Sequence, residues 1–318
     1  VVLVQLPVQG HDFFFSKENI PLAAAYLQVI GKELGMDVAL LPRPLMSYGS
    51  DQAILRFILH IQPDMVGMSC YEWNVERSLF LAQQLKHHLP ACTIVLGGPE
   101  ITPDNEFLLQ HRDFDIGVVG EGEEAWELLL QSFPKIPDAH GLLMKKEGRW
   151  HFNGNRSTPS ALGRWPSPYL SGELDSHLNG VLWLETVRGC VHRCTYCYYH
   201  KQFPRIRTFP MERIAMEVKR AWEKGFKEVV FLDPCFARRP DLEKLLDELA
   251  NINYDRQLQF HAEGNAEEID PPLAEKMGRT GFVQMEVGLQ SINKNTLRKI
   301  HRSFHPQRFL QGVRSLQD

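Results

Sequence analysis

Short apolar runs alternate with amphipathic stretches along the first 133 residues of the chain. Apolar runs of about four to eight residues are typical of strands buried on both faces, and longer stretches with a helical period are typical of helices. We therefore predict strands at residues 1–7, 37–42, 64–70, 92–98 and 114–120, and helices at about 21–34, 51–61, 74–87, 103–110 and 122–132. Alternation of this kind indicates a doubly wound α/β domain with a parallel sheet over residues 1–133.

The pattern weakens over residues 134–180, where a hairpin-like segment precedes a stretch rich in Pro, Ser and Gly. We interpret this segment as a linker. Alternation resumes at residue 181, with strands expected at 181–189, 228–233, 258–264 and 282–290, and helices at about 210–224, 239–250, 271–279 and from 294 onward. Four such units predict a partial (β/α) barrel over residues 181–318, either open or cut short at Asp318, because a complete barrel has eight.

Composition narrows the function classes. The 318 residues carry 35 Lys and Arg against 39 Asp and Glu, a net charge of -4, with no long basic run, which argues against a nucleic-acid partner. No apolar stretch reaches the roughly 18 residues of a membrane span, and no secretory signal pattern begins the chain. We therefore expect no membrane association and a cytoplasmic location.

Glycines follow two of the predicted strands, at Gly97-Gly98-Pro99 and at Gly120-Glu121-Gly122-Glu123. In doubly wound folds, ligands bind outside the carboxyl ends of the strands. Glycine there either lets a large flat ligand approach the backbone closely or simply makes a tight turn, and the sequence does not decide between the two. Neither GxGxxG after the first strand nor GxxxxGK[ST] occurs, so a dinucleotide or P-loop site is not supported.

Three of the six cysteines fall within eight residues, as Cys190, Cys194 and Cys197 in the spacing CxxxCxxC. Soft sulfur ligands at this density select an iron–sulfur cluster or zinc. Structural zinc needs a fourth protein ligand, for which His192 and His200 are the nearest candidates. A [4Fe–4S] cluster held by three cysteines instead leaves one iron open to a ligand that is not protein.

This cysteine motif, with Tyr196 before its last cysteine, resembles the signature of the radical S-adenosylmethionine (SAM) enzymes, and the resemblance continues through residues 225–236 and 283–302. It implies that the open iron of the cluster binds SAM, which an electron from the cluster then cleaves to a 5′-deoxyadenosyl radical. Side chains at strand ends are expected to hold SAM, with Tyr196, Asp233, Glu263 and Gln290 as candidates and Glu286 as a weaker one. The superfamily often carries a GGE-like motif that binds the SAM amine, and this chain departs from it with Leu232-Asp233-Pro234 at that place.

With the second half interpreted in this way, the first half resembles the cobalamin-binding domain of a subclass of radical SAM enzymes. The resemblance implies a cobalamin site formed by Ser69, Tyr71, Gly97, Gly98, Gly120, Glu121 and Gly122. The DxHxxG loop that gives many cobalamin domains a histidine ligand is absent, and His11 lacks its spacing, so no histidine from that motif is expected on cobalt. The run Phe13-Phe14-Phe15 is expected at the domain interface or at the corrin edge.

The favoured hypothesis is a cobalamin-dependent radical SAM enzyme that methylates an unactivated carbon of an unknown small-molecule or peptide substrate, with flavodoxin or ferredoxin as electron donor. Three alternatives stay open. The first is a cyclase or rearrangement enzyme in which cobalamin does not carry methyl. The second is a zinc-stabilised binding module without catalysis. The third, methylthiolation of tRNA, is disfavoured because Cys70 and Cys92 do not form a second cluster set and no basic appendage is present.

Overall fold

The computed structural model describes residues 1–8, 20–158, 161–203 and 205–317. The chain divides into two compact units. The first unit comprises Val1–Pro159 and Trp165–His177, and the second comprises Ser160–Arg164 and Leu178–Asp318. The predictions for His11 and for Phe13, Phe14 and Phe15 fall outside the described residues.

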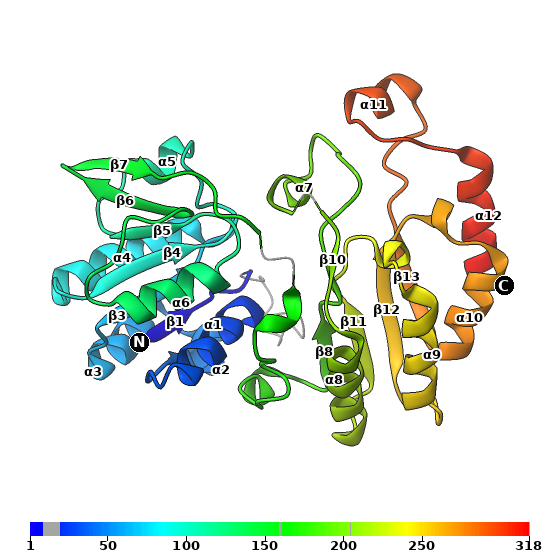
Figure 1. Ribbon diagram of the computed structural model, residues 1–318, viewed down its shortest axis with the longest axis horizontal. Coiled ribbons are helices and arrows are strands. Elements are labelled where there is room, and N and C mark those ends of the chain that lie inside the picture. Colours follow the sequence, from blue (N-terminus) through cyan, green and yellow to red (C-terminus); the bar gives the residue numbers. More distant parts are fainter. Residues whose placement is uncertain (9–19, 159–160, 204, 318) are drawn as a thin grey trace. The chain divides into compact units, whose positions relative to one another are not determined.

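The first unit is built on one seven-stranded sheet in the order β2-β1-β3-β4-β5-β6-β7 (Figure 1). Its strands are β1 (Val2–Val4), β2 (Ala39–Leu40), β3 (Met65–Ser69), β4 (Thr93–Gly97), β5 (Ile116–Val118), β6 (Leu142–Lys146) and β7 (Arg149–Phe152). Strands β1 to β5 pair in parallel. The order β2-β1-β3-β4-β5 is that of a doubly wound fold, whose switch point lies between β1 and β3. The predicted fold class is confirmed.

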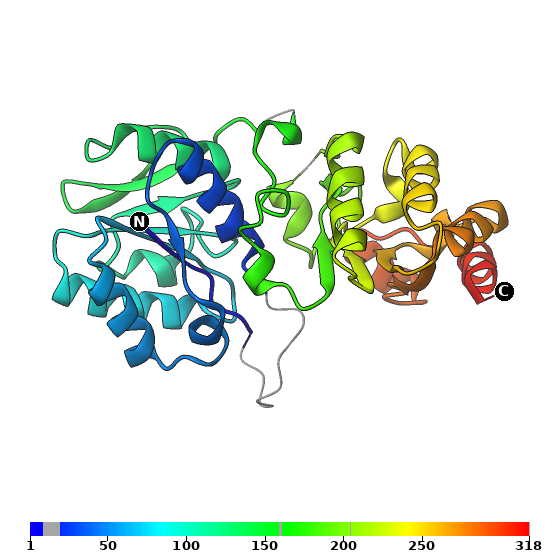
Figure 2. The same ribbon diagram turned by 90° about the horizontal axis from the view of Figure 1, so that it is seen from below.

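Helices cover both faces of this sheet because its strands are apolar on both sides (Figures 1 and 2). Within β1, Leu3 packs with one face while Val2 and Val4 pack with the other. The first face is covered by α1 (Leu22–Glu33) and α6 (Glu123–Ser132), and the second by α2 (Arg43–Tyr48), α3 (Asp51–Ile61), α4 (Val75–His88) and α5 (Glu106–Leu109).

The hairpin predicted within the linker instead extends the first sheet. Strand β6 pairs antiparallel with β5, and β7 pairs antiparallel with β6. Leu143 is buried in the core, and Trp150 stacks on Phe114 with ring centroids 4.3 Å apart. Trp165 also packs into the core of the first unit. Much of the segment 134–180 therefore belongs to the first unit, because apolar side chains of the hairpin pack into the core of that unit.

The second unit carries a four-stranded parallel sheet in the order β13-β12-β11-β8. Its strands are β8 (Val181–Leu184), β11 (Glu228–Phe231), β12 (Gln259–Gly264) and β13 (Phe282–Val287), and its longer helices are α8 (Met211–Glu223), α9 (Leu242–Ile252), α10 (Pro271–Thr280) and α12 (Pro306–Gln317). Alternating parallel strands and helices confirm the predicted partial barrel. None of the helices in the described part of the chain is long and apolar enough to cross a membrane.

One face of this sheet is closed by an aromatic core. Phe231, Phe260 and Phe282 lie on three neighbouring strands, and Phe236 packs against Phe231 and Phe282 with centroids 4.7 and 5.2 Å apart. Apolar residues of α8 and α9 are also buried in the second unit; they include Ile214, Val218, Leu245, Leu246 and Leu249. The apolar face thus fixes the register of the strands, and with it the places where they end.

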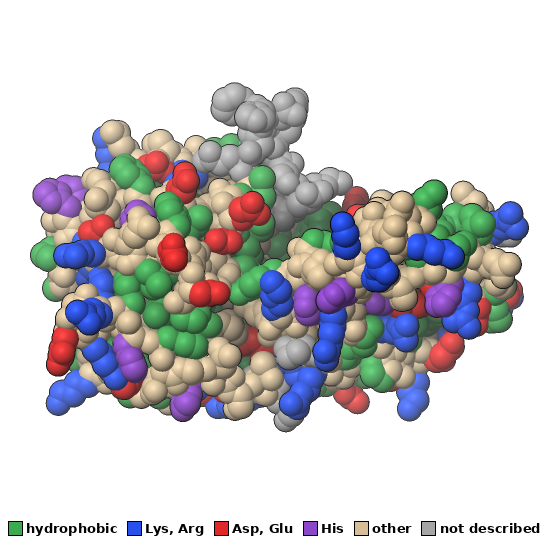
Figure 3. Space-filling view, turned by 90° about the horizontal axis from the view of Figure 1, so that it is seen from above, with side chains coloured by type: hydrophobic (Ala, Val, Ile, Leu, Met, Phe, Trp, Pro, Cys, Tyr) green, Lys and Arg blue, Asp and Glu red, His purple; other side chains and the backbone are tan. Residues whose placement is uncertain are grey.

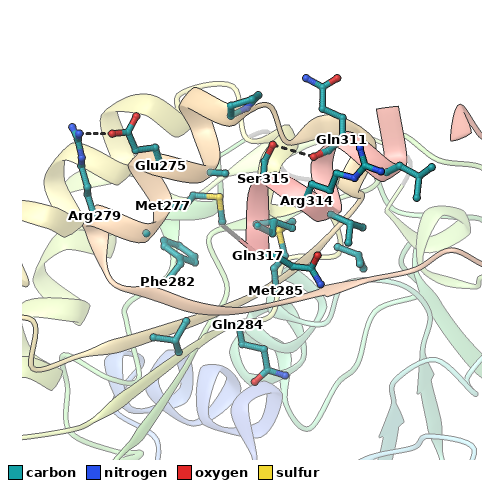
Figure 4. A pocket seen from close by; sticks show the side chains of 18 of the residues that line it. Glu275, Met277, Arg279, Phe282, Gln284, Met285, Gln311, Arg314, Ser315 and Gln317 are labelled. Atoms are coloured by element: carbon teal, nitrogen blue, oxygen red, sulfur yellow. Dashed lines mark hydrogen bonds and ion pairs between the residues drawn. The ribbon is translucent and has the colours of Figure 1, made fainter. Parts of the chain in front are cut away.

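A groove of about 1160 Å³ lies between α10, α12 and β13 (Figure 4). Met277, Phe282 and Met285 form its apolar wall, while Glu275 and Arg314 lie at its polar margin. None of the residues predicted from the sequence to bind a cofactor lines this groove. The residues predicted to bind cofactors lie instead at strand ends and on the loops that follow them.

Substituting Gly98 tests how tightly the strand ends of the first unit are packed. Gly98 has φ +103, and a Cβ there would lie 2.5 Å from the carbonyl oxygen of Cys70. We expect Gly98→Ala to lower the free energy of unfolding of the first unit by about 3 kcal/mol, from left-handed strain plus overpacking against backbone. Gly120→Ala, at φ +88 with open space around the Cβ position, should cost only about 1 kcal/mol. Urea denaturation measures both, and equal costs would contradict the packing.

Candidate functional site

The cysteine motif lies on a loop held at its neck by a two-stranded hairpin. Strand β9 (Val187–Arg188) pairs antiparallel with β10 (Arg207–Thr208), and the loop between them includes α7 (Tyr199–Gln202). Gly189 begins the loop with φ +114, and a Cβ there would lie 2.0 Å from the carbonyl oxygen of Arg205. Only glycine therefore lets the two sides of the neck approach this closely beside Cys190.

Asp233 lies beneath this neck and is fully buried. Its carboxylate accepts hydrogen bonds from the backbone N–H groups of Thr186 and Val187, at 2.7 and 2.9 Å, and from the Thr186 hydroxyl. Burial raises the pKa of Asp233 to about 7, while these donors act in the opposite direction. The carboxylate is occupied by protein donors, so the structure makes Asp233 a positioning residue, and its burial does not support the expected contact with SAM.

Arg239 holds the same strand end from the other side. Its guanidinium, 3% exposed as a residue, donates to the carbonyl oxygens of Thr186 at 2.7 Å and Phe209 at 3.2 Å. We call Asp233 and Arg239 the strand-end clamp. Sequence reasoning missed Arg239, because nothing in its local pattern distinguishes a buried arginine from an exposed one.

Cys190 faces a fourth cysteine. Its sulfur lies 3.6 Å from that of Cys235, which is 5% exposed and follows the clamp residue Asp233 by two positions. The contact between the sulfurs lowers the pKa of Cys190 to about 6 and raises that of Cys235. The structure therefore packs the Cys235 thiol against the first cysteine of the motif.

Cys194 is anchored to the segment that follows α11 (Lys294–Lys299). Arg302 donates to the Cys194 sulfur at 3.8 Å and to the carbonyl oxygen of Gly288 at 3.2 Å. The next residue, Thr195, donates its backbone N–H to the carbonyl oxygen of Ile300 at 3.1 Å. A guanidinium thus lies beside one cysteine sulfur and ties the cysteine loop to the segment after α11. Sequence reasoning also missed Arg302, whose partners are distant in the chain.

The donor set fits an iron–sulfur cluster by its chemistry. Cys190 and Cys197 are partly exposed and Cys194 is buried, so one loop presents three thiols. Among the described residues, no three His, Cys, Asp or Glu side chains are gathered closely enough to hold a metal ion. His192, a candidate zinc ligand, is 3.7 Å from Glu268, which also pairs with Arg238 at 2.6 Å.

The other expected SAM contacts lie at three places around the second sheet. Tyr196 is 56% exposed within the cysteine loop, and Gln290 is exposed two residues after Gly288, which Arg302 ties to Cys194. Glu263 pairs in register with Glu286 on the neighbouring strand. Removal from water, and then repulsion from Glu286, raise the pKa of Glu263. Tyr196 therefore lies on the cysteine loop, and Gln290 follows a residue that Arg302 links to that loop. Glu263 lies near the end of β12.

The strand ends of the first unit are braced together by Asn74, which is 2% exposed. Its amide donates to the carbonyl oxygens of Leu6 at 2.8 Å and Ser69 at 3.1 Å, and so joins the ends of β1 and β3. Its side-chain oxygen accepts from the N–H of Tyr71 at 2.8 Å. Tyr71 stacks on Trp73 with ring centroids 4.5 Å apart. The brace leaves an aromatic pair at the switch point between β1 and β3.

Glycines at the neighbouring strand ends leave open space. A Cβ at Gly97 would meet only Val118, at 3.9 Å, and one at Gly120 would meet nothing within 4 Å. Gly122 is similarly open, with Leu27 at 3.8 Å. We call Gly97, Gly120 and Gly122 the glycine cradle, which side chains would fill. The cradle fits a large flat cofactor lying against backbone, as expected for cobalamin; Ser69 and Glu121 are partly exposed beside it in the chain.

Comparison with known proteins matches both units. Residues 15–130 match the B12 binding domain, and residues 184–318 match the Radical SAM superfamily. The fold and the cysteine loop thus define a protein with a B12-binding domain joined to a radical SAM domain. This pair of domains is the one expected of cobalamin-binding radical SAM enzymes.

Relatives of known activity share this arrangement. The chain is 31% identical over 202 residues to the 2-(S-pantetheinyl)-carbapenam-3-carboxylate methyltransferase of Streptantibioticus cattleyicolor, and 30% identical over 200 residues to the cobalamin-dependent radical SAM methyltransferase TokK of Streptomyces tokunonensis. These matches cover 57% and 58% of this chain and 29% of each relative. The fold matches TsrM from Kitasatospora setae, solved with cobalamin and a [4Fe-4S] cluster bound, with a TM-score of 0.77 at 16% identity over 99% of this chain and 67% of that one.

The pH dependence of stability tests the buried state of Asp233. Its folded pKa of about 7 lies above the ordinary 3.8, so the folded chain binds the proton more tightly than the unfolded chain. Stability from this group is therefore present at low pH and is lost as pH rises from about 4 to about 7, with a slope of at most about 1.4 kcal/mol per pH unit. We expect Asp233→Asn to remove this slope and Asp247→Asn, an exposed control on α9, to keep it. Urea denaturation from pH 5 to 8 measures both, and parallel curves for wild type and Asp233→Asn would be inconsistent with this.

Proposed function

We propose that the chain is a cobalamin-dependent radical SAM methyltransferase acting on an unactivated carbon of a small-molecule substrate. The observation that carries the proposal is the presence, in one chain, of a three-cysteine loop at a strand end and of a glycine cradle at the ends of a doubly wound sheet. The names of two relatives, both methyltransferases, support methyl transfer. The predicted cytoplasmic location stays a prediction.

Cys190, Cys194 and Cys197 would hold the cluster, and the glycine cradle would receive cobalamin. When bound, the cluster supplies the electron that cleaves SAM, and cobalamin supplies a transferable methyl group. Tyr196, Gln290 and Glu263 remain our candidates for binding SAM. A flavodoxin or ferredoxin is proposed as the electron donor.

The protein's own residues position and protect this site. The strand-end clamp fixes the backbone four residues before Cys190 from both its N–H and its carbonyl side. Arg302 places positive charge beside the sulfur of Cys194, where it offsets the negative charge of a thiolate ligand. Asn74 holds two strand ends together beneath the proposed cobalamin site. A fixed surrounding shell of this kind keeps metal ligands in one geometry.

Removal of single cysteines tests the cluster. We expect Cys190→Ala, Cys194→Ala and Cys197→Ala each to lower iron from about four per chain to near zero after anaerobic reconstitution, because three thiolates are needed to hold the cluster. Cys92→Ala is the control, since Cys92 is buried in the first unit. Iron and zinc are measured by elemental analysis. Zinc without iron in the wild-type chain would exclude the proposed function.

Filling the cradle tests cobalamin. Gly97→Leu introduces a side chain where only Val118 lies near, and Gly97 has no positive φ, so the fold should tolerate it. We expect hydroxocobalamin affinity to fall at least about tenfold, because overpacking of about 1.4 kcal/mol or more opposes binding. Gly278→Leu, a similarly open glycine on α10, is the matched control. Cobalt retained after desalting measures binding, and equal retention by both variants would place cobalamin elsewhere.

A further inference from the structure

The cysteine loop faces a cysteine that lies outside its own motif. The sulfurs of Cys190 and Cys235 are 3.6 Å apart, although the two residues are 45 positions apart in the chain. Among the described residues, this is the one hydrogen-bonding contact between two cysteine sulfurs, and both thiols are free. The contact therefore pairs the first proposed cluster ligand with a thiol to which the proposed function gives no role.

The backbone holds both thiols in this contact. Cys235 lies between Asp233, whose carboxylate is occupied by backbone donors, and Phe236, which is fully buried in the aromatic core. Cys190 donates its backbone N–H to the carbonyl oxygen of Phe203 at 3.4 Å. Because both backbones are fixed, side-chain rotation and a small backbone movement are enough to shorten the sulfur–sulfur distance to the roughly 2.05 Å of a disulfide.

The other two cysteines of the motif are held in different surroundings. Cys194 is buried, and Arg302 donates to its sulfur at 3.8 Å. Cys197 donates its backbone N–H to the carbonyl oxygen of Cys194 at 3.0 Å and is partly exposed. In the part of the chain that the structure describes, neither of their sulfurs forms a hydrogen-bonding contact with the sulfur of Cys190. The geometry thus favours a bond from Cys190 to Cys235 over a bond within the motif.

Access and charge determine which oxidant reaches the pair. Cys190 is partly exposed and Cys235 is only 5% exposed, so a small oxidant meets Cys190 first. Residues 189–208 and 288–308 contain nine Lys or Arg and four His but no Asp or Glu. Figure 3, which views the molecule from the side of α7 and α11, shows Lys, Arg and His side chains gathered over the second unit. Charge of this sign raises the local concentration of small anions.

We propose that Cys190 and Cys235 are a site of reversible disulfide formation, at which an anionic low-molecular-weight disulfide such as glutathione disulfide oxidises the chain when no cluster is bound. The inference rests on the proposed function only where it gives the Cys190 sulfur a cluster iron as its other partner. No metal takes part in the oxidation itself.

The oxidation proceeds by two exchanges. The Cys190 sulfur attacks glutathione disulfide, forms a mixed disulfide and releases one glutathione. The Cys235 sulfur then attacks the Cys190 sulfur, forms the protein disulfide and releases the second glutathione. The two protein thiols lose two electrons and two protons, and the two glutathione molecules that leave carry them.

The disulfide and the cluster exclude each other, because each uses the sulfur of Cys190. In the empty chain, the disulfide keeps this sulfur from oxidation to sulfinic or sulfonic acid, which thiols do not reverse. A thiol reductant returns both cysteines to the form that can bind iron. The pair therefore gives the empty loop a protected state from which it can recover.

Peptide mapping of the full chain, free of cluster, tests the proposal. The fully reduced chain is incubated anaerobically with glutathione disulfide, alkylated, and digested without reduction. We expect two of its six thiols to be lost and one linked peptide pair, which contains Cys190 and Cys235, to dominate. A linkage that joins Cys194 to Cys190 or to Cys197, or a Cys235 that stays alkylated throughout, would overturn the proposal.

Variants of Cys235 test the second exchange. Cys235→Ala should stop at a mixed disulfide between Cys190 and glutathione, with no bond between protein sulfurs. Cys235→Ser, which nearly keeps the size of the side chain, should do the same and replaces Cys235→Ala if thermal melts show that the latter does not fold. The control is Cys92→Ala, because Cys92 is similarly buried at 3% exposure, and it should form the linked pair at the wild-type rate. Formation of a protein disulfide by either Cys235 variant at that rate would contradict the pairing.

A cationic oxidant tests the class of disulfide. We expect the ratio of the rate with glutathione disulfide to the rate with cystamine, which carries two positive charges, to fall at least about threefold between about 20 and 300 mM salt. A ratio that does not change with salt would overturn the selection of an anionic oxidant.

The reconstituted chain separates this proposal from the proposed function. Its disulfide should form at least about tenfold more slowly than that of the empty chain, because the Cys190 sulfur is bound to iron. Equal rates in the two would overturn the mutual exclusion of disulfide and cluster. A chain that takes up no iron when all its thiols are reduced overturns the proposed function instead, while peptide mapping of the empty chain still decides whether the disulfide forms.

Discussion

The cysteine loop depends on one buried carboxylate. Asp233 receives three hydrogen bonds from Thr186 and Val187, just before the loop begins, and no solvent reaches it. An unsatisfied buried carboxylate would be very costly, so the strand end has only one favourable position relative to β11. Because Cys235 follows two residues later and contacts Cys190, the same turn fixes both the start of the loop and the surroundings of its first thiol. Cys190, the first proposed cluster ligand, is thereby positioned through the backbone, and Asp233 acts on it only indirectly.

The two units provide space for a cofactor in different ways. In the first unit, Asn74 fills the space at the neighbouring ends of β1 and β3, whereas Gly97 and Gly120 leave space at the next two strand ends, those of β4 and β5. In the second unit, the cysteine loop extends beyond the sheet. It is held by the pairing of β9 with β10 at its base and by the contact of Arg302 with Cys194. A flat ligand suits the first arrangement, since backbone forms the wall, and a metal cluster suits the second, since flexible side chains supply the ligands.

Sequence reasoning recovered what periodicity encodes. Strands buried on both faces, such as β3 and β4, appear as apolar runs, and CxxxCxxC is specific because few other chemistries need three thiols at that spacing. Sequence reasoning was wrong where contacts between distant segments determine the structure. The hairpin of β6 and β7 was interpreted as part of a linker, because its own residues do not indicate that it pairs with β5. Asp233 looked like a ligand-binding strand-end carboxylate, because the donors that occupy it, on Thr186 and Val187, come from a distant segment.

Positive charge surrounds the cysteine loop, since residues 189–208 and 288–308 contain no Asp or Glu. A cluster that accepts an electron becomes more negative, and nearby cations stabilise that reduced state; Arg302, beside the Cys194 sulfur, lies closest to this role. The exposed cations of residues 189–208 and 288–308 act over a longer range and are screened by salt, so they affect encounter more than they affect the bound cluster. Arg302 therefore lies in contact with a cysteine sulfur, whereas the other cations near the loop are exposed to solvent. The partly buried Arg302 would raise the affinity of a cluster bound at this loop for an electron.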